Sequence, residues 1–250
     1  MSASSTTAQL DVIAFSLYGR SPKYTVGALR NAALAARFYP AWTLRFYVGA
    51  SVPEATARGL VDAGAEVVPM PGREDASAMF WRFLAFEDPR ARRVMVRDCD
   101  SRFSERERAA VTEWLARGDA FHILRDHPLH DAAMLGGLWG ALTAPLRHLG
   151  ALVRGARVEG RYGEDQRFLR DAVYPLARGR ACVHDSFFAR EPWRRPFPTA
   201  REGAAFVGEV FDEDDRPRLS DRALLARAER SRPRLLTLRA RSWLRARLGR

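Results

Sequence analysis

Two carboxylates two residues apart give this sequence its clearest chemical signal. Asp98 and Asp100 follow the apolar run 94–96 and precede a helix start at Ser104, so we expect them where a buried strand reaches the surface. Carboxylate oxygens are the ligands that hard divalent cations prefer, and a cation held there can neutralise the charge of a diphosphate. The spacing therefore predicts a metal-dependent phosphate site. The simpler alternative is a solvated turn that caps the next helix.

A second triplet of the same form, Asp212 to Asp214, lies in an acidic stretch just before Pro217. It lacks the apolar strand before it and the capped helix after it. We therefore expect residues 211–221 to form a surface loop without a chemical role.

The elements that must position the first triplet follow from hydrophobic patterning. Alternating strands and helices of this length predict an α/β fold with a mainly parallel sheet, which binds ligands at the carboxyl ends of its strands. The second half is less regular, with a Gly-rich segment at 134–140. We expect strands at 10–17, 43–48, 66–70, 93–97, 120–124 and 181–183, and helices at 24–38, 54–63, 77–87, 104–117 and 164–174.

Length and composition fit one such domain, predicted at 10–220, between a flexible N-terminus at 1–9 and a tail at 221–250. The two cysteines fit a reducing compartment. The sequence has no run of 18 apolar residues and no secretory signal pattern. These features predict a cytoplasmic protein.

The net charge of +11 at first suggests nucleic acid. However, 40 of the 41 basic residues are Arg and only Lys23 is Lys, which suggests coding bias. Residues 231–250 hold seven Arg and no acid, so the rest of the chain carries only +4. We therefore disfavour nucleic acid. Residues 233–250 have the pattern of a basic amphipathic helix that can contact an anionic membrane at its inner face. A solvated extension is the alternative.

Several further motifs occur in a characteristic order. They are the aromatic–Arg segment 80–83, the glycine pair Gly136 and Gly137, the Glu-Asp-Gln triplet at 164–166, and a His after the last strand, His184. Together with Asp98-Cys99-Asp100, this order resembles the GT-A glycosyltransferases over roughly residues 10–210. It is similar to family 8, family 32 and uncharacterised bacterial relatives.

The resemblance implies a GT-A-like fold and a metal-dependent glycosyltransferase. Such an enzyme transfers a sugar from a nucleotide-diphosphate sugar, here expected to be a UDP-sugar, to a hydroxyl of a glycan or lipid-linked saccharide. The implied cofactor is Mn²⁺ or Mg²⁺, held by Asp98, Asp100 and His184. A locally hydrogen-bonded His is the alternative for His184. Arg82 would hold an Asp of the triplet or the sugar.

The resemblance also implies the roles of Asp165 and Gln166 at the acceptor face. Asp165 would be the general base of an inverting reaction, whereas in retaining members the adjacent Gln166 faces the anomeric carbon. A carboxylate that merely stabilises a helix N-terminus is the alternative for Asp165.

The remaining expected residues complete the donor pocket. Asp126, Gly136 and Gly137 would line the sugar site, because glycine lets the backbone approach a ligand closely; a tight turn also explains the glycines. The end of the first strand, with Phe15, Ser16 and Tyr18, would hold the nucleotide base, with Tyr18 stacked on it.

Two other functions remain open. A sugar-nucleotide nucleotidyltransferase has a similar fold, but it needs a Gly-rich basic loop after the first strand, and residues 16–24 fit this poorly. A non-enzymatic basic module would bind membrane or nucleic acid through the tail. The sequence contains neither G-x-G-x-x-G after the first strand nor G-x-x-x-x-G-K-[ST], which disfavours dinucleotide and P-loop enzymes.

Overall fold

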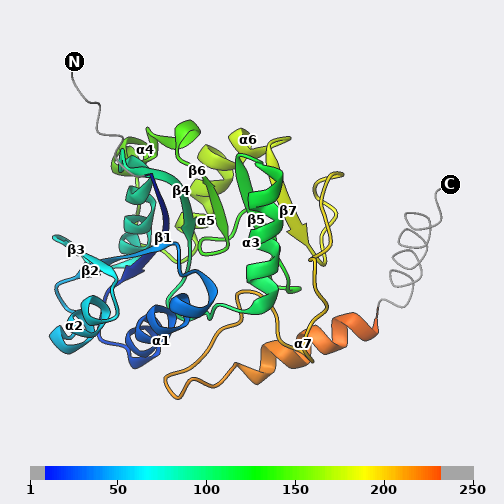
Figure 1. The fold of residues 1–250 in the computed structure, drawn as a ribbon, viewed down its shortest axis with the longest axis horizontal. Coiled ribbons are helices and arrows are strands. Elements are labelled where there is room, and N and C mark those ends of the chain that lie inside the picture. The colour runs from blue at the N-terminus through cyan, green and yellow to red at the C-terminus, as the bar shows by residue number, and fades with distance from the viewer. Residues whose placement is uncertain (1–8, 232–250) are drawn as a thin grey trace.

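A seven-stranded sheet forms the centre of the protein (Figure 1). The computed structural model describes residues 9–231 of the 250. The spatial order is β3-β2-β1-β4-β6-β5-β7, and all neighbours are parallel except at β6, which is antiparallel to β4 and β5. The predicted mainly parallel α/β sheet is confirmed. Its strands are β1 Leu10–Leu17, β2 Thr43–Gly49, β3 Glu66–Met70, β4 Ala91–Val96, β5 Phe121–Arg125, β6 Trp139–Leu142 and β7 Ala181–Asp185.

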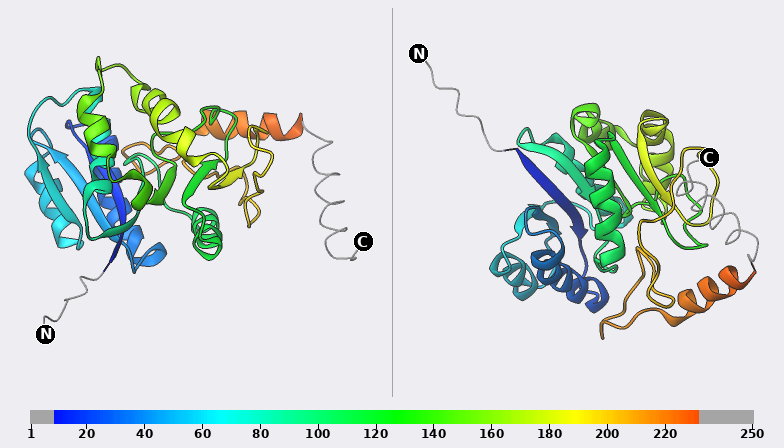
Figure 2. Two further views of the ribbon diagram at one scale, coloured as in Figure 1. Left: turned by 90° about the horizontal axis from the view of Figure 1, so that it is seen from above. Right: turned by 45° about the vertical axis from the view of Figure 1, so that its right-hand side comes forward.

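Helices cover both faces of this sheet, because its strands carry apolar side chains on both sides (Figures 1 and 2). In β1, Val12 and Ala14 pack with the cluster on one face, while Ile13 and Phe15 pack with the cluster on the other. The second face is covered by α1 Pro22–Phe38, α2 Glu54–Asp62 and α3 Glu105–Arg117. The first is covered by the 3₁₀ helices η1 Ala76–Glu87 and η2 Ala144–Leu146, with α4 Leu149–Gly155, α5 Glu164–Phe168, η3 Leu169–Val173 and α6 Tyr174–Ala177.

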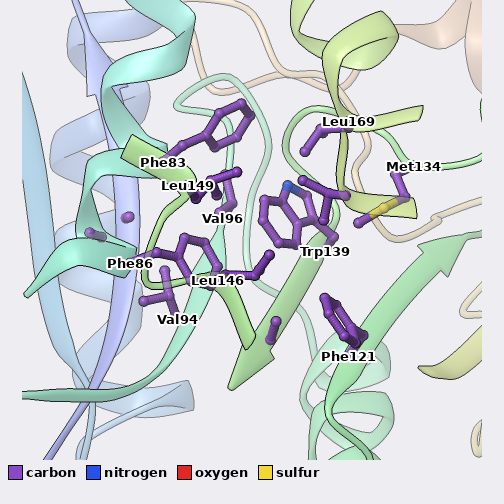
Figure 3. Packing of buried hydrophobic residues seen from close by; sticks show 14 of the residues in the cluster. Phe83, Phe86, Val94, Val96, Phe121, Met134, Trp139, Leu146, Leu149 and Leu169 are labelled. Atoms are coloured by element: carbon purple, nitrogen blue, oxygen red, sulfur yellow. The ribbon is translucent and has the colours of Figure 1, made fainter. Parts of the chain in front are cut away.

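The core of the first face is built around Trp139 on β6 (Figure 3). Its ring stacks on Phe86 at 5.1 Å and meets Phe83 edge-on at 5.7 Å between centroids. Strand β6 was not predicted, since only the Gly-rich segment 134–140 was recognised. Four residues with a glycine among them carry too little pattern, and the strand is fixed by its two antiparallel neighbours.

The helix predicted at 164–174 is interrupted. It divides into α5, the π-helical turn η3 and α6, with Pro175 in the first turn of α6. Because proline lacks an N–H and its ring crowds the preceding turn, the wider turn of η3 accommodates it. The other predicted elements match those observed to within about two residues.

The C-terminal part is described only as far as residue 231. Helix α7, Leu219–Arg230, begins within the last three residues of the loop predicted at 211–221, which contains Asp212 and Asp214 (Figure 1). The proposed amphipathic helix at 233–250 lies outside the described residues, as do residues 1–8 of the N-terminus. Within 9–231, no helix combines the length and apolar character that a membrane crossing needs.

We expect Trp139→Ala to lower the free energy of unfolding by about 3–5 kcal/mol, because it empties the centre of the apolar cluster. Urea denaturation followed by circular dichroism measures this. The matched control is Trp193→Ala, since Trp193 is 40% exposed and its loss should change stability by less than about 0.5 kcal/mol. Equal losses in the two variants would contradict this account of the core.

Candidate active site

The Asp98-Cys99-Asp100 triplet lies at the carboxyl end of β4, beside the carboxyl end of the parallel strand β1. The turn is closed by Ser101, whose backbone N–H and hydroxyl both donate to the carbonyl of Asp98. A pocket of about 440 Å³ opens here, within the roughly 300–1,000 Å³ typical of small-molecule sites. It is lined by Ser16, Tyr18, Lys23, Tyr24, Met79, Arg82, Asp98, Cys99, Asp100, Gly136, Tyr162, Asp165, Gln166, Val210 and Arg218.

Arg82 on η1 joins two carboxylates of this pocket. Its guanidinium donates through Nη1 to Asp98 and through Nη2 to Asp165 Oδ2 at 2.8 Å. The side chain is 4% exposed, and its backbone N–H donates to Ser16 Oγ at 3.1 Å. Burial alone would lower the pKa of Arg82, but the two carboxylates outweigh it and raise the pKa. Arg82 therefore stays charged and fixes both acids, of which Asp98 was an expected partner.

One face of α1 contacts the triplet directly. Lys23, Gly27 and Asn31 are spaced by four residues and so lie along one stripe of the helix. Lys23 Nζ lies 2.6 Å from Asp100 Oδ2, and Asn31 Nδ2 donates to the carbonyl of Ser101 at 2.8 Å. A Cβ at Gly27 would come within 2.0 Å of the Cys99 carbonyl oxygen. The missing side chain thus lets the helix approach closely enough for Lys23 to reach Asp100.

Gly136, which lines the pocket, and the adjacent Gly137 lie close to two of its carboxylates. A Cβ at Gly136 would lie 2.1 Å from Asp165 Oδ2, and one at Gly137 would lie 2.0 Å from Asp98 Oδ2. The absent side chains let the backbone approach these two carboxylates, whereas the expected approach to a sugar stays a prediction.

The pocket carboxylates differ in their electrostatic surroundings. Burial, together with the nearby charge of Asp98, raises the pKa of Asp100, although Lys23 opposes the shift. Burial also raises the pKa of Asp165, against the influence of Arg82. Asp98 and Asp100 thus repel one another across one pocket, and a divalent cation would relieve that repulsion. Two carboxylates fit Mg²⁺ or Mn²⁺, which complete their coordination with phosphate oxygens and water.

Aromatic side chains form much of the pocket rim. Tyr18, expected near the base, lines the pocket and packs edge-on against Trp81 at 6.0 Å. Tyr162 was not predicted; it is 92% exposed and lies between Gly160 and Gly163, both at positive φ. Its position between two glycines, just before the Asp-Gln pair, is the feature of the sequence that could have indicated a residue at the pocket rim.

Arg218, Tyr24, Met79 and Val210 also line the pocket and were not predicted. Arg218 precedes α7, more than a hundred residues after the triplet. No local pattern connects such distant segments, so only the folded chain reveals these residues.

Two expected pocket residues lie in the interior instead. Phe15 is fully buried and stacks on Phe46 at 4.5 Å, because odd-numbered residues at this end of β1 face the helix layer of α1. Asp126 is also fully buried, and it accepts hydrogen bonds from Arg106, Ser186 and the Val207 backbone. Although burial opposes it, this surrounding of donors lowers the pKa of Asp126, so the carboxylate is a structural anchor rather than part of the sugar pocket.

His184 is not brought to Asp98 and Asp100, which corrects the expected three-residue metal site. It lies on β7, three strands from β4 in the sheet, or about 14 Å at the usual strand spacing. Its ring is fully buried and interacts with His122 and Glu113. These surroundings match the alternative given for His184, a histidine that is hydrogen-bonded locally.

No protein-family model matches this sequence. No curated protein matches it either. Among solved structures, a glycosyltransferase involved in glycosylation of the major capsid of PBCV-1 aligns over 70% of this chain and 81% of its own, with 17% identity and a TM-score of 0.45. The 4-diphosphocytidyl-2C-methyl-D-erythritol synthase of Anaerococcus prevotii aligns over 73% and 91%, with 9% identity and a TM-score of 0.48.

A third similar structure is glucosyl-3-phosphoglycerate synthase of Mycobacterium tuberculosis, in complex with Mn²⁺, UDP and phosphoglyceric acid. It aligns over 74% of this chain and 72% of its own, with 14% identity and a TM-score of 0.46. At this level of similarity, function has to be inferred from the residues of the pocket itself.

Proposed function

We propose that this protein is a metal-dependent glycosyltransferase that uses a nucleotide-diphosphate sugar, a UDP-sugar in the first instance. One observation carries the proposal: a single pocket combines the carboxylate pair Asp98 and Asp100, the cations Lys23 and Arg218, and the buried acid Asp165. The carboxylate pair would hold a metal ion, the two cations would bind the diphosphate leaving group, and the buried acid would accept the proton of the acceptor hydroxyl. The motif order similar to family 8 and family 32 enzymes supports the same function.

The phosphate end of the reaction is served by Lys23 and Arg218. Negative charge accumulates on the diphosphate as the bond to the sugar breaks, and positive groups fixed beside it lower the barrier. Asp98 and Asp100 would hold Mn²⁺ or Mg²⁺, which when bound supplies further neutralisation of that charge. Arg82 keeps Asp98 in place, and Asp100, which is paired with Lys23, would be the second ligand of the cation.

The acceptor end is served by Asp165. Its Oδ2 accepts from Arg82 and its Oδ1 accepts from the backbone N–H of Gln166 at 2.8 Å, which fixes the plane of the carboxylate. A raised pKa makes Asp165 a stronger base than an ordinary Asp, suited to take the proton of a hydroxyl as it attacks the sugar. In this scheme the anomeric configuration inverts. Retention would instead place Gln166 opposite the anomeric carbon.

The proposed acceptor class rests on the expectation that the basic residues 233–250 contact a membrane. We propose a glycan or a lipid-linked saccharide as acceptor, with residues 233–250 as the contact to an anionic membrane at the cytoplasmic face. Product analysis separates this function from nucleotidyl transfer. Glycosyl transfer from a UDP-sugar releases UDP, whereas nucleotidyl transfer from a nucleoside triphosphate releases pyrophosphate.

We expect UDP to stabilise the protein in a Mn²⁺-dependent manner, with a thermal shift that is lost in Asp100→Asn. At 100 times its dissociation constant, a ligand adds about 2.7 kcal/mol. Asp214→Asn changes the same position of the second, exposed triplet and should keep the full shift. The same measurement is made with GDP, so that the shifts caused by the two nucleotides can be compared. Equal shifts in both variants would remove Asp100 from the site.

Lys23→Met should weaken UDP binding at least tenfold, since a charge-assisted hydrogen bond contributes about 1.5–3 kcal/mol. Titration calorimetry with UDP and with uridine measures this. Because uridine lacks the diphosphate, its affinity should not change, and Lys23→Arg should retain much of the UDP affinity. An equal loss for uridine would show that Lys23 supports the fold of the pocket instead.

Asp165→Asn should lower kcat by roughly 10²–10⁴ while leaving the Kd of UDP within a few fold. In the wild type, kcat should fall as the pH drops through the raised pKa of Asp165, hence at a higher pH than for an ordinary aspartate. The rate of UDP release from a UDP-sugar, measured as a function of pH at saturating donor, reports this fall in kcat at low pH. Wild-type kcat in Asp165→Asn would exclude it as the base.

A further inference from the structure

A second cluster of metal-ligating side chains lies inside the protein, away from the pocket. His122 on β5 is in register with Cys182 on β7, and His184 follows two residues later on the same strand, so all three point to one face of the sheet. His122 Nε2 lies 2.9 Å from His184 Nδ1, and Cys182 Sγ lies 3.8 Å from the same atom. All three ligand atoms lie within 4.8 Å of one another.

These separations are close to those around one metal ion. Bond lengths of about 2.0–2.1 Å to nitrogen and about 2.3 Å to sulfur place ligand atoms roughly 3.3–3.9 Å apart. A few tenths of an ångström of widening between the two imidazoles would admit an ion. The strand pairing of β5 and β7 thus brings the His122–Cys182–His184 cluster together before any ligand is present.

The outer contact of His184 orients its ring as a metal-bound imidazole is usually oriented. His184 Nε2 lies 3.3 Å from Glu113 Oε2 on α3, which leaves Nδ1 facing His122 and Cys182. A carboxylate on the far nitrogen of a ligating His is the common arrangement around protein metal sites. Trp114 stacks on His122 at 5.0 Å and Phe197 lies 5.4 Å from His184, so the cluster is enclosed by aromatic rings.

The protonation states also fit a metal site. Burial lowers the pKa of His122 and His184, so both rings are neutral and carry a lone pair. Burial raises the pKa of Cys182 to about 12, so the thiol keeps its proton until a metal displaces it. With His184 Nε2 donating to Glu113, His122 Nε2 donates to His184 Nδ1 and His122 Nδ1 has no partner. Metal binding through His122 Nε2 would replace that hydrogen bond with a metal bond and leave the ring proton on Nδ1.

We propose that the His122–Cys182–His184 cluster binds one Cu⁺ ion in three-coordinate geometry. The thiolate and two neutral imidazoles carry one negative charge, so Cu⁺ gives a neutral complex suited to a fully buried site. Zn²⁺ would leave a net positive charge there and prefers a fourth ligand, which this cluster does not supply among the described residues. On binding, the Sγ–H proton leaves to solvent as the Cu–S bond forms, with no change of oxidation state.

The test uses the full chain expressed with added copper and, separately, purified protein titrated anaerobically with Cu⁺ against the chelator bicinchoninate. We expect one equivalent of copper in the wild type, with one sulfur and two nitrogen neighbours in its X-ray absorption spectrum. Cys182→Ser and His122→Gln should lose the ion. Cys99→Ser, which changes the other cysteine, should keep it, and so should Asp100→Asn, because the site is independent of the proposed transferase pocket.

Circular dichroism of the copper-free variants shows whether they keep the native fold. Absence of copper from the wild type under both loading conditions would overturn the proposal, whatever the variants do. Copper that stays bound in a folded Cys182→Ser variant would also overturn it. One equivalent of Zn²⁺ with no Cu⁺ would overturn the three-coordinate assignment.

Discussion

A single buried guanidinium connects the parts of the pocket. Arg82 comes from η1, Asp98 from the end of β4 and Asp165 from the start of α5, and the two ion pairs fix the three elements relative to one another. Removing one partner of a buried pair costs about 3–5 kcal/mol, because the other charge is left in a low dielectric. The glycine pair is packed against these two carboxylates, with Gly136 beside Asp165 and Gly137 beside Asp98.

Arginine and lysine have different roles in this strongly basic chain. In the interior arginine neutralises acids that hold the fold together, as Arg125 does for Asp185 and Arg97 for Glu107. In the pocket, the only lysine of the sequence contacts Asp100. A guanidinium fork binds a carboxylate in fixed geometry, whereas an ammonium on a flexible stem can move from one anion to another. This difference suits Lys23 to a site where a charged product must leave.

The sequence allowed the fold class and part of the site to be predicted, for local reasons. Short windows of sequence contain the strand before Asp98, the capping pattern at Ser104 and the single charged residue, Arg82, of an apolar segment. Ser104 does accept from the Glu107 backbone N–H at 3.2 Å. The interpretation of the sequence failed where the partner of a residue lies far from it in the sequence. Asp126 is neutralised by Arg106 and Arg201, and nothing in the loop around Asp126 indicates either arginine.

The insertion of β6 between β4 and β5 also has a kinetic consequence. Its register pairs Val94 with Ala141, far apart in the sequence, and the antiparallel direction delivers Gly136 and Gly137 to the pocket. The pairing of Val12 with Val94 between β1 and β4 is also non-local, and for both pairings the loop-closure entropy must be overcome. The pocket is therefore complete only once both pairings have formed. Nucleotide would then recognise only the last species on the folding pathway and would slow unfolding rather than speed folding.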